Sequence, residues 1–169
     1  MTISMYKASV PVFQQILGSM DAILAKAQIH INERKIDQQA FLQARLFPDM
    51  FHFTRQVQIA CDFAKGCTAR LAGQEVPSYE DNENSIEELR ARIAKTLAFI
   101  ASVPAAAIDG SEERDIHVGS GDKARQFKGQ QYLLNYALPH FYFHATTTYA
   151  LLRHNGVAVG KKDFIGNIS

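Results

Sequence analysis

The sequence contains no tryptophan, only two cysteines and five prolines in 169 residues, and its charges nearly cancel. Its 18 basic and 17 acidic side chains give a formal net charge of +1. Nucleic-acid-binding surfaces usually carry a clustered basic excess, so we expect no nucleic-acid partner. No apolar run approaches the roughly 20 residues that cross a bilayer, and the first residues lack a signal-peptide pattern. We therefore expect no membrane association.

The two cysteines, Cys61 and Cys67, lie six residues apart in a segment predicted to be helical. Side chains at that spacing do not share neighbouring turns of one helix face, which predicts free thiols and a cytoplasmic protein. Apolar residues make up 47% of the sequence and charged residues 21%, close to the average for globular proteins. Residues 1–169 are therefore predicted to form a single domain with one core.

Four segments repeat apolar residues at three- and four-residue steps, the pattern of amphipathic helices. They cover about residues 5–31, 48–71, 85–104 and 130–154. The third has the clearest start, because Ser85 with Glu88 forms a capping box, and it stops at Pro104. Four such helices in one domain predict an all-α fold, a four-helix bundle.

The segments between and after these helices are predicted to be irregular or extended. EERDIHV and ARQFK flank the turn-like GSGD at 119–122, which predicts a small β-hairpin between the third and fourth helices. The tail from Gly156, GVAVGKKDFIGNIS, is rich in glycine and is predicted to be an extended C-terminal arm. The short connection between the second and third helices predicts that they are antiparallel neighbours. Asp62 and Lys65 are predicted to form an ion pair on the surface.

Two histidines, His140 and His144, lie one turn apart on the fourth helix. Imidazoles at that spacing can share one zinc, nickel or iron ion, but a third protein ligand is needed. The intervening Phe141, Tyr142 and Phe143 lack the glutamate of the HExxH pattern, which argues against a metalloprotease. The same spacing also suits two histidines that fill a core and satisfy their hydrogen bonds there.

Pro139 comes directly before the first of these histidines. It has no N–H for the carbonyl of Asn135, and its ring presses against that group, so the helix is predicted to kink or restart here. A carbonyl without its helical partner must find another one, in water, a side chain or a ligand. This polar interruption in an apolar helix is where a binding site could form.

The chain resembles a bacterial family of unknown function within the DinB/YfiT-like superfamily of four-helix bundles, and the resemblance covers essentially its whole length. The segments that carry the resemblance are SMYKASVPVF at 4–13, RLFPDM at 45–50, QVQIACDFAKG at 56–66, ARLAGQEVP at 69–77, DNENS at 81–85, LPHFYFHATTTYALLRHNGV at 138–157 and GKKDFIG at 160–166. The resemblance implies an up-down-down-up bundle and a homodimer. Many members carry a metal site of three histidines, two from the last helix and one from the second, and some resemble thiol-dependent transferases or hydrolases.

Residue by residue, His140 and His144 match the histidine pair of that superfamily, whereas Gln56 stands where its third histidine is expected. His52, one turn earlier, is a substitute ligand. One hypothesis is therefore a divalent-metal site, zinc, nickel or iron, formed by His140, His144 and Gln56 or His52, although glutamine is a weaker ligand than imidazole. The alternative is a metal-free bundle, either dimeric and structural or binding a small molecule, in which the pair and Gln56 form a polar core network. Whether the protein is an enzyme stays open.

Overall fold

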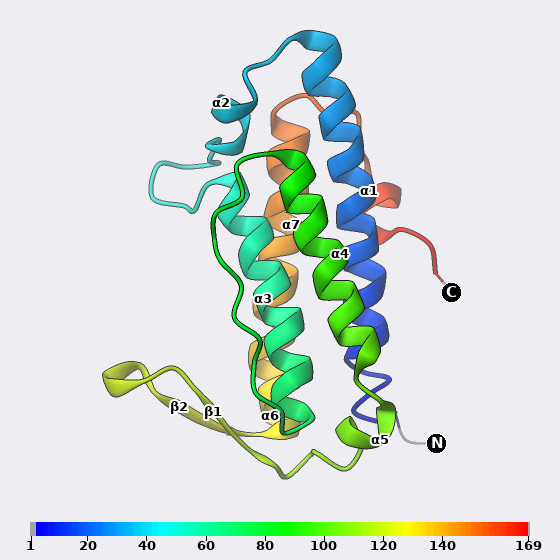
Figure 1. The fold of residues 1–169 in the computed structure, drawn as a ribbon, viewed down its shortest axis with the longest axis vertical. Helices are drawn as coiled ribbons and strands as arrows, with labels where there is room; N and C mark the ends of the chain where they lie inside the picture. The colour runs from blue at the N-terminus through cyan, green and yellow to red at the C-terminus, as the bar shows by residue number, and fades with distance from the viewer. Residues whose placement is uncertain (1–2, 169) are drawn as a thin grey trace.

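Four long helices run side by side through the computed structural model, which describes residues 3–168 (Figure 1). They are α1 (Val10–Arg34), α3 (Phe53–Leu71), α4 (Ile86–Ser102) and α7 (Leu138–His154). Helix α3 packs against α4 on one side and α7 on the other, and α1 closes the bundle by packing against the same two helices. The predicted all-α four-helix bundle is thereby confirmed.

The apolar stripes of these helices meet in one core. Phe13 of α1 meets Phe141 of α7 edge to face, with the ring centroids 4.8 Å apart. Cys61 and Cys67 lie fully buried in the same core as free thiols, as predicted. Burial disfavours the thiolate and raises the pKa of Cys61 to about 12, which leaves that thiol inert.

Side chains cap the starts of α3 and α4, and one of these two starts differs from the prediction. Ser85 caps α4 as predicted, since its Oγ accepts a hydrogen bond from the N–H of Glu88 at 3.1 Å. The start predicted for the second helix is wrong: α3 begins at Phe53, and His52 caps it. Pro48 instead belongs to a turn that follows a short helix, α2 (Gln38–Leu42), which the periodicity did not predict.

The predicted antiparallel packing of the second and third helices is also wrong. Helices α3 and α4 run in the same direction, because residues 72–85 return along the outside of the bundle before α4 begins (Figure 1). An extended chain advances about 3.3 Å per residue and a helix about 1.5 Å, so this segment can span the 19 residues of α3. We refer to residues 72–85 as the strap.

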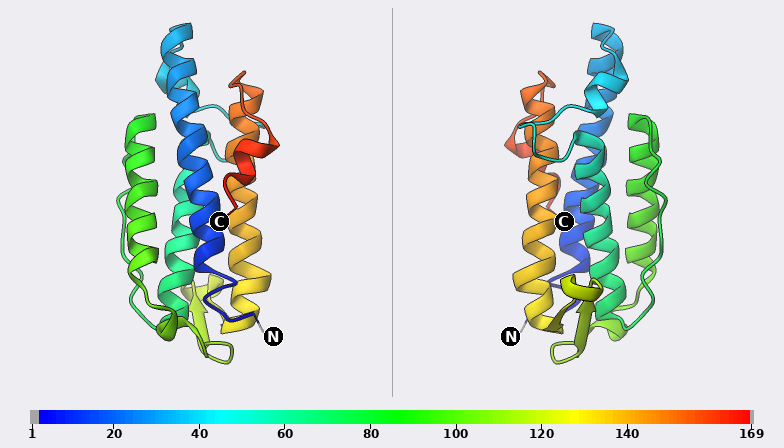
Figure 2. Two further views of the ribbon diagram at one scale, coloured as in Figure 1. Left: turned by 90° about the vertical axis from the view of Figure 1, so that its right-hand side faces the viewer. Right: turned by 90° about the vertical axis from the view of Figure 1, so that its left-hand side faces the viewer.

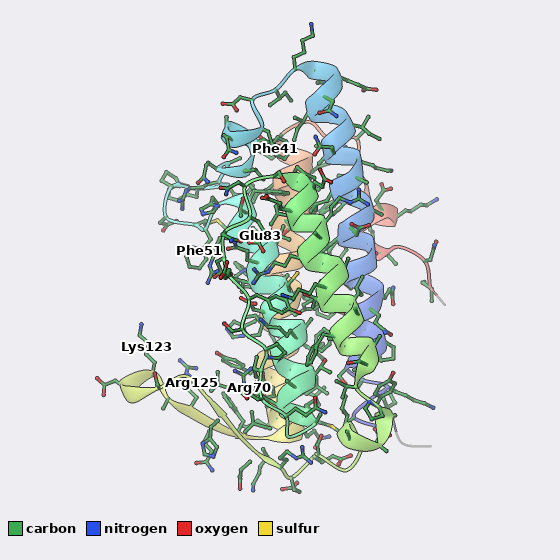
Figure 3. All side chains as sticks on the ribbon, viewed as in Figure 1. Phe41, Phe51, Arg70, Glu83, Lys123 and Arg125 are labelled. Carbon is green, nitrogen blue, oxygen red and sulfur yellow. The ribbon has the colours of Figure 1, made fainter. Side chains whose placement is uncertain are left out.

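A buried arginine of α4 fixes the strap. The Arg92 guanidinium, whose side chain is 2% exposed, forms ion pairs with Glu83 at 2.8 Å and Asp81 at 3.0 Å, both on the strap. It also pairs with Asp62 of α3 at 2.8 Å. Figure 3 shows Glu83 on the strap beside the two helices. Arg92 therefore holds the strap and both parallel helices together.

The ion pair of Asp62 and Lys65 lies at the edge of this cluster. The Asp62 side chain is 35% exposed, whereas Lys65 is buried where a surface position was predicted. Lys65 is buried, with its Nζ 3.0 Å from Asp62 and 3.7 Å from the ring centroid of Tyr79 on the strap. The pair predicted from i,i+3 spacing does form. The strap covers it, and the strap's path could not be read from the helical pattern.

The remaining short elements lie at the ends of the bundle, except for one short helix that lies along the side of α1 (Figure 1). After α5 (Ala105–Ile108), strands β1 (Asp115–Val118) and β2 (Arg125–Lys128) pair antiparallel around a short 3₁₀ turn (Gly121–Lys123), which confirms the predicted hairpin. The C-terminal arm is not wholly extended, since it contains α8 (Lys161–Ile165), which packs on α1 (Figure 2). In the part of the chain that the structure describes, none of the helices has the length and apolarity to cross a membrane.

Replacing Arg92 with alanine should destabilise the protein by about 3 kcal/mol or more, because three carboxylates would lose their buried counter-charge. The measurement is the free energy of unfolding from urea denaturation. Arg90→Ala is the matched control: Arg90 lies on the same helix, but its pair with Asp21 at 2.8 Å is half-exposed, so its loss should cost less than about 1 kcal/mol. Equal losses in both variants would show that the strap is not held by Arg92.

Candidate site at the histidine pair

The last helix is interrupted directly before Pro139. A four-residue helix, α6 (Gly129–Tyr132), passes into a single π-helical turn (Leu133–Ala137), which leads into α7. The N–H of Leu138 donates to the carbonyl of Leu133, five residues back. This turn before the proline therefore contains one residue more than an α-helical turn. The predicted interruption is present, as a π turn. Such turns are frequent at functional sites because they re-aim neighbouring side chains.

His140 lies one turn after this interruption and is half-buried. Its Nδ1 is 2.7 Å from the carbonyl oxygen of Tyr136, within the π turn. A carbonyl oxygen can only accept, so Nδ1 must carry the hydrogen. In the neutral imidazole, Nε2 then holds a free lone pair.

His144 has the same arrangement with a different partner. Its Nδ1 is 2.7 Å from Oε1 of Gln56, which reaches across from α3. The amide of Gln56 has a fixed orientation, because its Nε2 donates to the carbonyl of Phe51 at 3.0 Å. Nδ1 of His144 is therefore the donor, and its Nε2 also keeps a free lone pair. The two imidazoles, one turn apart, therefore both leave Nε2 available as a hydrogen-bond acceptor or metal ligand.

Burial keeps His144 neutral. The side chain is 8% exposed, and desolvation, together with the nearby charges of His140 and Arg55, lowers its pKa to about 4. A neutral imidazole is the form that binds a metal ion or accepts a hydrogen bond. His144 is therefore ready for either role at neutral pH.

In the structure His52 caps a helix, a role different from the substitute metal ligand considered above. Its Nδ1 accepts a hydrogen bond from the N–H of Arg55 at 3.4 Å, so that lone pair caps α3. Gln56 is close to the pair, but its amide oxygen accepts from His144. Within residues 3–168, no three histidine, cysteine, aspartate or glutamate side chains gather to hold a metal ion. The predicted ligand set of His140, His144, Gln56 or His52 stays a prediction.

Aromatic rings surround the pair, a feature that helical periodicity did not predict. Phe63 of α3 stacks on both imidazoles, with centroids 4.7 Å from His140 and 6.2 Å from His144. Tyr136 packs on His140 at 4.3 Å, and the Phe143 ring meets His144 edge-on at 5.1 Å. These rings come from α3, α7 and the π turn, so only the tertiary structure brings them together.

Comparison with known proteins agrees with this fold. The family described as a domain of unknown function (DUF1993) matches residues 5–165. Among solved structures, a DinB family member protein from Shewanella denitrificans has 38% sequence identity and a TM-score of 0.88. The match covers 96% of this chain and 92% of that one. Among curated proteins, none matches the sequence.

The low pKa of His144 predicts an acid-dependent loss of stability. Its pKa is near 6.5 in the unfolded chain and about 4 in the folded one, so below pH 6.5 the unfolded state binds a proton that the folded state excludes. In chelator, the free energy of unfolding should fall by about 2 kcal/mol more in the wild type than in His144→Gln between pH 7 and 4.5. Urea denaturation at each pH measures this.

His154→Gln is the control for this prediction, because His154 lies exposed near the end of the same helix. It should keep the wild-type slope of stability against pH. A His144→Gln variant that also keeps that slope would contradict the burial of a neutral imidazole.

Proposed function

Because the chain belongs to the DUF1993 family, a domain of unknown function with a DinB-like fold, we propose that it binds a divalent transition-metal ion through Nε2 of His140 and His144. The observation that carries the proposal is the shared tautomer of the two imidazoles. Nδ1 of His140 donates a hydrogen bond to the carbonyl oxygen of Tyr136, and Nδ1 of His144 donates to Oε1 of Gln56. Nε2 of each imidazole is left free.

This hydrogen bonding is the arrangement expected around metal-bound histidines. A ligating imidazole usually donates its other N–H to a carbonyl or carboxylate, which fixes the ring and raises its basicity. Here Gln56 takes that supporting role for His144, in place of being a ligand itself. The nitrogen donors suit zinc, nickel or iron. Because Gln56 accepts from His144 and does not serve as the third protein ligand, water or a small ligand would have to complete the coordination of the ion.

When bound, such an ion would act as a Lewis acid toward a ligand held beside it. The chain contributes the two imidazoles, the neutral state of His144 and the rings of Phe63, Tyr136 and Phe143 that contact them. A small molecule would then bind the ion as an additional ligand.

Metal binding by untagged protein tests the proposal. Isothermal titration with zinc or nickel, supported by elemental analysis, should show one ion per chain, and His140→Ala or His144→Ala should abolish it. Gln56→Ala should lower the affinity about ten- to a hundredfold, since it removes only the support of His144. Gln56→Glu keeps an acceptor and should retain the affinity.

His117→Ala is the matched control, since His117 lies on the hairpin strand β1, away from the pair along the chain. It should bind metal like the wild type. Wild-type protein that remains metal-free at micromolar zinc and nickel would refute the proposal.

A second candidate function, metal-free binding of a small molecule, is favoured by the lack of a third strong ligand within the described residues. The two free Nε2 atoms would then accept hydrogen bonds from a ligand that stacks on the rings. A metabolite that raises the melting temperature in the presence of chelator, and fails to do so for His140→Ala, would support this function over the first.

A further inference from the structure

The strap is fastened to the bundle by backbone hydrogen bonds at its start, and its end is the cap of α4. The N–H of Gln74 donates to the carbonyl of Ala69 at 2.9 Å, where α3 ends, and Ser85 caps α4. Among the described residues, none of residues 75–83 is buried or takes part in a backbone–backbone hydrogen bond. Segments with few buried contacts and few backbone hydrogen bonds open at a lower free energy than the core.

Side-chain charges hold the middle of the strap in place. Asp81 pairs with Arg55 of α3 at 2.6 Å and with Arg92 of α4 at 3.0 Å, and Glu83 pairs with Arg92 at 2.8 Å. The ring of Tyr79 lies within 3.7 to 5.3 Å of three cationic groups of the same two helices. The middle of the strap is therefore held by charge more than by apolar burial.

The strap is not closely packed against α4. A hollow of about 520 Å³ lies between them, lined by Tyr79, Glu80 and Glu83 of the strap and by Ala91 and Lys95 of α4, among other residues. Well-packed protein interiors contain few spaces larger than a water molecule. The strap can therefore lift from the helices without drawing buried apolar side chains out of the core.

Polar side chains and a thiol lie buried beneath the strap. Lys65, Arg92 and Thr96 are buried, and Cys61 is fully buried. Burial raises the pKa of the Cys61 thiol to about 12, and the neighbouring groups that also shift this pKa include Thr96, Arg92 and Glu83 of the strap. The thiol therefore lies within the cluster that the strap covers.

We propose that the middle of the strap, residues 75–83, is a cover that opens as a unit while the four-helix bundle stays folded. Opening separates Asp81 and Glu83 from their arginines and gives water access to the Cys61 thiol. The face of α3 and α4 beneath the cover then loses two carboxylates and becomes more positively charged.

The rate at which each cysteine reacts with N-ethylmaleimide tests the proposal. This reagent is uncharged, so the cations beneath the strap do not attract it, and mass spectrometry resolves the two labelled cysteines. Cys67 is the internal reference: it is also fully buried, but it lies toward Tyr132 of α6. In native, untagged protein at pH 7, Cys61 should react about tenfold faster than Cys67 or more, because local opening is more frequent than global unfolding.

Three variants separate local opening from unfolding of the whole protein. Asp81→Asn removes the charge that pairs with two arginines and should speed the labelling of Cys61 about tenfold. Asp21→Asn is the matched control, because it breaks a similarly exposed ion pair between α1 and α4 and should leave the Cys61 rate unchanged. Val157→Ala creates a cavity in the core after α7 and should speed the labelling of Cys67 but not of Cys61.

Each result decides for or against the cover. Equal labelling rates of Cys61 and Cys67 in the wild type would show that only global unfolding exposes the thiol, and would overturn the proposal. Equal acceleration of both cysteines by Val157→Ala would do the same. A Cys61 rate that Asp81→Asn leaves unchanged would show that charge does not hold the strap closed, and would overturn the proposal as well.

Discussion

The buried Arg92 is the interaction on which the arrangement of the bundle depends. Its guanidinium joins Asp62 of α3 to Asp81 and Glu83 of the strap, and it is almost wholly removed from water. A buried arginine is tolerated only when its charge is matched, and here three carboxylates match it. Because the strap is fixed in this way, α3 and α4 can pack in parallel although they are consecutive in the chain.

The same cluster reaches the first turns of α3, where the candidate site begins. Arg55 pairs with Asp81 of the strap, and Gln58 donates to Glu83 at 2.7 Å. Gln56 lies between these two residues in the sequence and reaches to His144 on α7. The packing of α3 against α7 therefore depends partly on the contacts of Arg55 and Gln58 with the strap, on the side of α3 that faces away from α7. The histidine pair is held from one side by this helix and from the other by the π turn.

Much of the fold could be predicted from local patterns, and the errors have physical causes. The capping of α4 by Ser85, the hairpin and the interruption before Pro139 each rest on a few neighbouring residues, and all were confirmed. The direction of α4 expected from the short connection was wrong, because a connection's length in residues does not reveal its path. The up-down-down-up order implied by the family resemblance does match the parallel α3 and α4. The start of α3 was misplaced because a proline suits both a first helical turn and the turn that precedes the helix.

By itself, the sequence determined the four long helices, the free cysteines, and the placement of His140 and His144 on one helix face, since these follow from spacing along the chain. Only the tertiary structure decided what surrounds them. The contact of Gln56 with His144 and the rings of Phe63 and Phe127 join residues far apart in the sequence. Such contacts depend on how the helices pack, and helical periodicity says which face is apolar but not which neighbour it meets.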